Sequence, residues 1–212
     1  MLLVAARNDL IDSHLKLIQA AGLKPVVIDV DSFALVNALE ASKGKKEQTT
    51  ALVNMGAKLT NINIVKDGVS YFTRDISLAG NNLTEAIQGG LNLDRPQAEK
   101  LKKEEGEAGG DSPVSKALDP VLKDLISELR LSFDYYENQA LERTTNRILF
   151  SGGSARLKNL DKFLTEALGI PAEIWNSLDG LGVSSDINKE RLTDAVPLLT
   201  VGIGLALREP NP

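Results

Sequence analysis

The chain has 212 residues, of which 42% are hydrophobic and 25% are charged, and this balance predicts a globular protein rather than a disordered chain. The formal net charge of -5 argues against a broad basic surface for nucleic acid or anionic lipid. Cysteine is absent, which excludes disulfides, thiolate metal sites and a cysteine nucleophile, and the single histidine, His14, lies in a helical pattern typical of a surface residue.

The amino-terminal segment is predicted to alternate between strands and helices. The expected elements, in chain order, are a strand over 2–6, a helix over 9–21, a strand over 26–28 and a helix over 32–39. Gly22 is placed where the first helix should end. The polar stretch 43–47 is the best candidate for a subdomain boundary, because it interrupts the apolar pattern.

A hairpin is predicted beyond this stretch. Asp67 and Gly68 separate two apolar runs, and Asp-Gly between such runs is a strong signal for a tight turn. The expected strands are 50–55, 61–65 and 69–76, followed by helices over 83–88 and 97–105 and an exposed loop over 106–112.

A long helix is predicted to begin at Asp119-Pro120, because aspartate can cap a helix and proline fits its first position. The elements expected after it are a strand over 147–150, a helix over 157–168, a strand over 171–175 and a buried core helix over 195–207. No apolar run reaches the roughly 18 residues that a membrane span needs. The alternation of strands and helices predicts an α/β fold.

Two glycine turns each follow an apolar strand, one at Gly56 and one at Gly152-Gly153. A turn without side chains lets backbone N–H groups approach a phosphate or a purine ring. Neither turn matches a Walker A loop or a GxGxxG fingerprint. Either turn alone is more often a plain strand end than a ligand site.

Several blocks of sequence occur in a distinctive order along nearly the whole chain. They are 26–35, 54–60, 71–75, 80–87, Ala98-Glu99 and 202–208. In this order they resemble the PilM family of type IV pilus assembly proteins, which are actin-like ATPases related to FtsA. The resemblance implies an actin-like (ribonuclease H-like) α/β fold that is incomplete and lacks the amino-terminal phosphate-loop part.

The family organisation implies three parts for this chain. Residues 1–45 would be a remnant of actin-like subdomain IA, 46–194 the nucleotide-facing subdomain II, and 195–212 a return helix that packs on subdomain IA. The implied location is cytoplasmic, peripheral to the inner membrane through partners. Those partners would be a PilN-type cytoplasmic tail and the inner-membrane complex of pilus assembly, without nucleic acid or direct membrane insertion.

The cofactor that the resemblance implies is ATP or ADP with Mg²⁺. Adenine and ribose are expected between 80–85, the helix around 99–103 and the Gly152-Gly153 turn, and the phosphates on 56–60. The implied cofactor-binding residues are Asn54, Gly56, Ala57, Lys58, Thr60, Gly80, Asn81, Glu85, Lys103, Gly152, Gly153 and Ser154. Glu85 and the lysines around Lys103 are equally typical of a solvated charged helix face.

Two departures from the family predict weak nucleotide binding with little or no hydrolysis. The family usually has aspartate at the position of Asn54, the implied metal ligand, and an amide lacks the negative charge that attracts Mg²⁺. Residues 1–39 also contain no DxG-type turn that could serve as a first phosphate loop. Phosphoryl transfer needs charge stabilisation on both sides of the phosphates, so we expect no efficient ATPase and name no catalytic residue.

Two other functions stay open. One is an interaction module of a pilus or secretion inner-membrane complex that binds no nucleotide. The other is a sugar or acetate kinase of the same superfold, which needs a catalytic acid beside a cleft. Asp29 and Asp31 are the nearest candidates for that acid, but Asp31 fits better as a helix cap and Asp29 as a polar residue at a strand end.

Overall fold

The computed structural model describes residues 4–42, 48–139 and 144–208. The chain divides into two compact units, one whose described part is residues 4–30 and a larger one over Asp31–Arg208. The expected boundary at 43–47 lies outside the described residues. The predicted division by actin-like subdomain, at residues 45 and 194, therefore stays a prediction.

The first unit contains one helix, α1 (Asn8–Ala20), and none of its residues is buried. The strands predicted over 2–6 and 26–28 are wrong in their described parts, since 4–6 and 26–28 form no strand. Val26 and Ile28 are 69% and 59% exposed. A strand must pair its backbone N–H and C=O groups with a neighbour, and the described residues offer no neighbouring strand to this segment.

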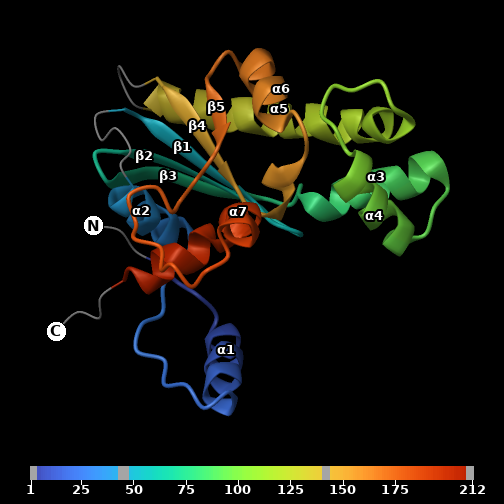
Figure 1. Cartoon of the computed structure of the whole chain (residues 1–212). Coiled ribbons are helices and arrows are strands. Elements are labelled where there is room, and N and C mark those ends of the chain that lie inside the picture. Colours follow the sequence, from blue (N-terminus) through green and yellow to red (C-terminus); the bar gives the residue numbers. More distant parts are fainter. Residues whose placement is uncertain (1–3, 43–47, 140–143, 209–212) are drawn as a thin grey trace. The chain divides into compact units, whose positions relative to one another are not determined.

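The second unit is built on a sheet of five strands in the order β3-β2-β1-β4-β5 (Figure 1). The strands are β1 (Thr50–Met55), β2 (Thr60–Lys66), β3 (Val69–Ile76), β4 (Arg147–Ser151) and β5 (Ala172–Ile174). β1 pairs with β2 antiparallel and with β4 parallel, so the carboxyl ends of β1 and β4 lie at one edge of the sheet. The predicted hairpin is confirmed, with Asp67 and Gly68 at φ 53° and 75°.

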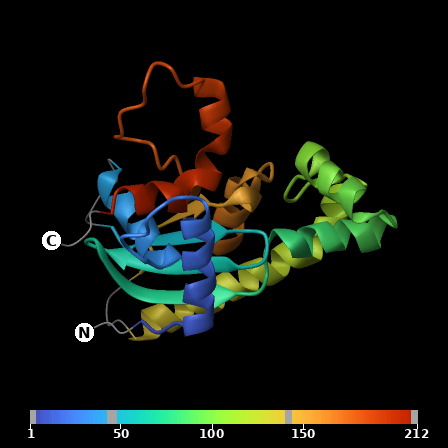
Figure 2. The same cartoon turned by 90° about the horizontal axis from the view of Figure 1, so that it is seen from below.

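Helices pack on both faces of this sheet and beyond the carboxyl ends of β1 and β4. They are α2 (Asp31–Ala41), α3 (Gly80–Leu91), α4 (Arg95–Glu105), α5 (Pro113–Gln139), α6 (Leu160–Leu168) and α7 (Lys189–Ala206), with a short 3₁₀ turn, η1, over Gly153–Arg156. Of these, α3 and α4 lie beyond the strand ends (Figure 1). Val53 of β1 belongs to the core under α5, whereas its neighbour Leu52 belongs to the core under α2. This alternation places α5 and α6 on one face and α2 and α7 on the other (Figures 1 and 2).

The helix α5 begins earlier than the sequence predicted, at Pro113 instead of Asp119-Pro120. Ser112 is the capping residue, because its Oγ accepts a hydrogen bond from the Ser115 N–H at 3.0 Å, and Pro113 takes the first helical position. Asp119 instead pairs with Lys123 one turn later, at 2.6 Å. Pro120 is tolerated inside the helix on its exposed side, where water can satisfy the carbonyl that loses its donor.

The helix α7 also begins earlier than predicted, after Asn188, whose side chain accepts a hydrogen bond from the Arg191 N–H at 3.0 Å. Only one side of α7 is buried, so the prediction of a buried core helix over 195–207 holds for that side alone. Its close packing on α2 depends on Gly204, where a Cβ would lie 1.7 Å from the Ala34 carbonyl oxygen. None of the described helices is long and apolar enough to cross a bilayer.

Candidate functional site

A cavity of about 680 Å³ opens where the carboxyl ends of β1 and β4 meet α3, α4 and α7. In sheets of this kind, ligands bind beyond the carboxyl ends of the strands. Most of the residues expected to bind nucleotide lie in its wall. They are Asn54, Gly56, Ala57, Gly80, Asn81, Lys103, Gly152, Gly153 and Ser154.

The turn after β4 is possible only with glycine. Gly152 has φ 89°, and a Cβ there would lie 2.4 Å from the Met55 carbonyl oxygen and 2.8 Å from Asn54 Oδ1. The Gly152 N–H donates to the Pro197 carbonyl of α7 at 2.7 Å. The β4 turn is therefore held between the end of β1 and α7, with its backbone at the cavity wall.

The turn after β1 holds the start of α3 in place. The Gly80 N–H donates to the Gly56 carbonyl at 3.0 Å, and the Asn81 N–H donates to the Ala57 carbonyl at 2.8 Å. Ser154 Oγ, from the turn after β4, also donates to the Gly56 carbonyl at 3.3 Å. The two glycine turns and the first turn of α3 consequently form one hydrogen-bonded assembly.

Lys102 links α4 to α3 beside the cavity. Its Nζ donates to the Gly80 carbonyl at 3.0 Å and to Thr84 Oγ1 and Glu99 Oε2 at 2.7 Å each. An ammonium group has three donors, so all of them are used within the protein. The side chain is only 14% exposed, which makes Lys102 a residue that positions the wall and leaves no donor for a ligand.

Glu99 is held in its charged form by the same contacts. Desolvation by partial burial raises its pKa, but hydrogen bonds from Lys102 and Thr84, with the positive charges of Lys102 and Lys103, outweigh it and leave the pKa below its ordinary value. The second oxygen, Oε1, lies 3.4 Å from Lys103 Nζ. The carboxylate is thus ionised and paired with two lysines.

Three of the expected residues do not line the cavity. Thr60 is fully buried, and its Oγ1 donates to the Leu78 carbonyl at 2.6 Å. Its hydroxyl therefore binds the segment before α3 and does not face the cavity. Lys58 and Glu85 are exposed outside the cavity wall.

Two arginines in the wall were not anticipated from the sequence. Arg95 Nη2 donates to Asn81 Oδ1 at 2.7 Å, which brings the first residue of α4 against the first turn of α3. Arg156, at the end of η1, is exposed at the same cavity. The sequence prediction began α4 at residue 97 and left Arg95 outside it. A signal for Arg156 was its position three residues after the Gly152-Gly153 turn.

The donor set of this cavity does not fit Mg²⁺ well, because Mg²⁺ beside substrate phosphates usually keeps several waters and is bound by one or two protein carboxylates. Asn54 Oδ1 already accepts a hydrogen bond from Ser151 Oγ at 3.2 Å. Among the described wall residues Glu99 is the one carboxylate, and it is paired with lysines. The part of the chain that the structure describes contains no cluster of acidic or histidine side chains that could hold a metal ion.

A nucleotide does fit this wall. It combines backbone turns without side chains, the cationic groups of Arg95, Lys103 and Arg156, and an apolar patch from Leu157 and Leu198. The volume is within the range of small-molecule and cofactor sites.

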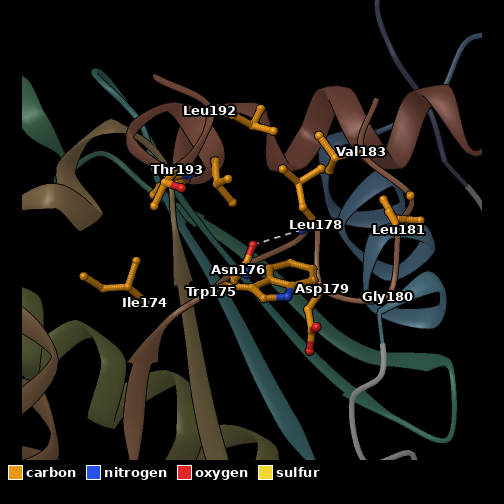
Figure 3. A pocket seen from close by; sticks show the side chains of 13 residues that line it. Ile174, Trp175, Asn176, Leu178, Asp179, Gly180, Leu181, Val183, Leu192 and Thr193 are labelled. Atoms are coloured by element: carbon orange, nitrogen blue, oxygen red, sulfur yellow. Dashed lines mark hydrogen bonds between the residues drawn. The ribbon is translucent and has the colours of Figure 1, made fainter. Parts of the chain in front are cut away.

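A second cavity, of about 910 Å³, lies between residues 174–183 and the first half of α7 (Figure 3). Its wall is mostly apolar, with the side chains of Trp175, Leu178, Val183 and Leu192 directed around it. Asp179 is the one ionisable residue among its described wall residues. A cavity without a cation offers nothing to neutralise phosphates, so it is a poor nucleotide site.

Comparisons with known proteins support an actin-like fold. A family model described as "Type IV pilus assembly protein PilM" matches residues 1–210. A solved structure of a PilM-PilN type IV pilus biogenesis complex is 30% identical, with a TM-score of 0.86 over 98% of this chain and 60% of that chain. MreB5 of Spiroplasma citri bound to ADP is 17% identical, with a TM-score of 0.65 over 96% of this chain and 65% of that one, and it shows the fold alone.

The cell division protein FtsA of Staphylococcus epidermidis is 23% identical over 186 residues, which cover 77% of this chain and 39% of FtsA. The chain therefore spans about two fifths of this relative and 60% of the PilM chain. The predicted actin-like fold and the predicted family are confirmed.

Proposed function

Because the chain belongs to the family of type IV pilus assembly protein PilM, we propose that it is a cytoplasmic scaffold of type IV pilus assembly that binds ATP or ADP with little or no hydrolysis. The observation that carries the proposal is the cavity at the carboxyl ends of β1 and β4. It brings two glycine turns, the first turn of α3 and several cationic side chains to one place.

Each part of the wall suits a different part of a nucleotide. The turns at Gly56 and Gly152 let backbone approach a phosphate or ring without obstruction by side chains. The apolar patch of Leu157 and Leu198 suits the face of a purine base. Arg156 lines the same cavity, where a guanidinium can stack on an aromatic ring.

The side chains of the described wall support the proposal of little or no hydrolysis. Phosphoryl transfer to water needs a group that orients the nucleophile and positive charge that stabilises the transferring phosphoryl group. Glu99, the carboxylate found among the described wall residues, is engaged with Lys102 and Lys103. Asn54 contributes a neutral amide where it meets Ser151, so neither residue supplies a free base.

The partners we propose are a PilN-type cytoplasmic tail and, through it, the inner-membrane complex of pilus assembly. The support is the similarity to the matched chain of the PilM-PilN structure. This chain covers 60% of that chain. The chain would then be cytoplasmic and peripheral to the inner membrane through these partners.

Isothermal titration of the purified chain with ATP and with ADP tests the nucleotide role. Replacement of Arg156 by alanine should weaken binding by about two- to thirtyfold, because a cation stacked on a base contributes roughly 0.5–2 kcal/mol. Lys162→Ala is the matched control, since Lys162 is an exposed cation on α6 outside the cavity. Absence of binding would refute the nucleotide role, and rapid phosphate release would refute the claim of little hydrolysis.

A further inference from the structure

The cavity at the carboxyl ends of β1 and β4, called here the nucleotide cavity, has more positive charge in its wall than Glu99 can neutralise. Lys102 and Glu99 form a close pair at 2.7 Å, and these two charges cancel. Arg95, Lys103 and Arg156 remain as cations of the wall. A nucleoside diphosphate carries about three negative charges near neutral pH, since its terminal phosphate has a second pKa of about 6. The wall can therefore match this charge without an added ion.

The oxygen atoms that the described wall offers to a divalent cation are either neutral or already paired with a positive charge. The Asn54 amide oxygen accepts from Ser151 Oγ at 3.2 Å, and both Glu99 oxygens face lysine ammonium groups. A hard cation such as Mg²⁺ would have to compete with these contacts for neutral or already paired oxygens. The described wall residues favour direct contact between phosphate and protein cations.

Arg95 is the cation best fixed for such a contact. Its guanidinium is bound to Asn81 Oδ1 at 2.7 Å, and the Asn81 N–H is bound to the Ala57 carbonyl at 2.8 Å. These two bonds connect Arg95 through Asn81 to the turn after β1, where the phosphates are expected. A guanidinium has five N–H donors, so the bond to Asn81 leaves others for a phosphate oxygen.

We propose that this chain binds a nucleoside di- or triphosphate independently of divalent metal. In this proposal Arg95 binds phosphate and neutralises the negative charge that Mg²⁺ would otherwise neutralise. The inference rests on the proposed nucleotide function. It adds a property of this chain's own residues, namely that phosphate charge is met by the guanidinium at the start of α4.

The test is isothermal titration of the full chain with ADP, once in excess EDTA and once in excess Mg²⁺. The two dissociation constants should differ by less than about threefold. Arg95→Gln should weaken binding in EDTA by about tenfold, because it removes a charge-assisted hydrogen bond to phosphate. Lys100→Gln removes an equal charge from the exposed face of α4 and should change binding by less than about twofold. Circular dichroism spectra of both variants establish that they are folded.

An Asn54→Asp variant provides the converse test. A carboxylate beside the turn after β1 restores the charge that Mg²⁺ prefers, so this variant should bind ADP about tenfold more tightly in Mg²⁺ than in EDTA. Binding by the unaltered chain only in Mg²⁺ would overturn the metal-independence while leaving the nucleotide function intact. Equal effects of Arg95→Gln and Lys100→Gln would overturn the role of Arg95. Absence of binding in both buffers would refute the nucleotide function itself.

Discussion

Replacement of Lys102 by methionine should loosen the α3–α4 side of the cavity. Methionine keeps most of the apolar stem but removes the ammonium that binds the Gly80 carbonyl, Thr84 and Glu99. The Gly80 carbonyl in the first turn of α3 would lose its bond to α4, and Glu99 would keep the hydrogen bond from Thr84 Oγ1 at 2.7 Å and the longer contact with Lys103 at 3.4 Å. Both stability and nucleotide affinity should therefore fall.

The expected decrease in the free energy of unfolding can be worked out from these three hydrogen bonds. A hydrogen bond contributes a net 0.5–1.5 kcal/mol, and one to a charged group roughly 1.5–3 kcal/mol. Glu99 is 38% exposed and can regain water, which reduces the loss. We expect the free energy of unfolding to fall by about 2 kcal/mol, equivalent to a Tm lower by about 4–8 °C for a unit of this size.

Urea unfolding and calorimetry measure this change, and titration with ADP measures the affinity. Lys100→Met is the control, because Lys100 lies two residues away on the exposed face of the same helix. It should lower the free energy of unfolding by less than about 0.5 kcal/mol. If the two variants unfold at the same urea concentration, the three bonds of Lys102 do not stabilise the protein as reasoned.

The other predictions concern two glycines and one carboxylate. Gly152→Ala should lower the unfolding free energy by at least about 2 kcal/mol in urea titrations, since φ is 89° and Cβ would approach the Met55 carbonyl to 2.4 Å; unchanged stability would contradict this geometry. Gly204→Ala should cost about 2–3 kcal/mol in the same assay, because α7 must move away from Ala34, and a neutral result would mean that the two helices are not in close contact. The pKa of Glu99 is depressed in the folded state, so the ionised Glu99 side chain stabilises the fold above the ordinary pKa of 4.5, and this stabilisation is lost as pH falls through the folded pKa. Urea midpoints measured from about pH 3 to pH 6 should show this loss for the unaltered protein. Glu99→Gln should give a flatter profile.

The central hairpin was predictable because its signals are local. The alternating apolar residues of β2, the apolar run that opens β3 and the Asp67-Gly68 turn are all contained within a short stretch of chain. The start of α5 was not predictable in the same way. Ser112-Pro113 and Asp119-Pro120 are equivalent helix-start signals, and the packing of Val114 and Leu118 in the core favours the first.

The site was predictable where it depends on backbone and not where it depends on side-chain contacts. Glycine after a strand indicates a close backbone approach, and both turns reach the cavity. Thr60 illustrates the opposite case, because the sequence does not reveal that the Leu78 carbonyl takes its hydroxyl. Arg95 and Arg156 are exposed cations without periodicity, and they become neighbours of one cavity only after α4 and η1 have folded.

The helix α7 forms part of the wall of both cavities, because Val196 and Pro197 line the larger one and Leu198 and Val201 line the nucleotide cavity. A displacement of α7 therefore changes the walls of both cavities. Pro197 also accepts the Gly152 N–H at 2.7 Å, so such a displacement is transmitted to the glycine turn after β4. If the chain binds nucleotide as proposed, a ligand of the apolar cavity that changes nucleotide affinity through α7 has its own affinity changed by nucleotide by the same coupling free energy.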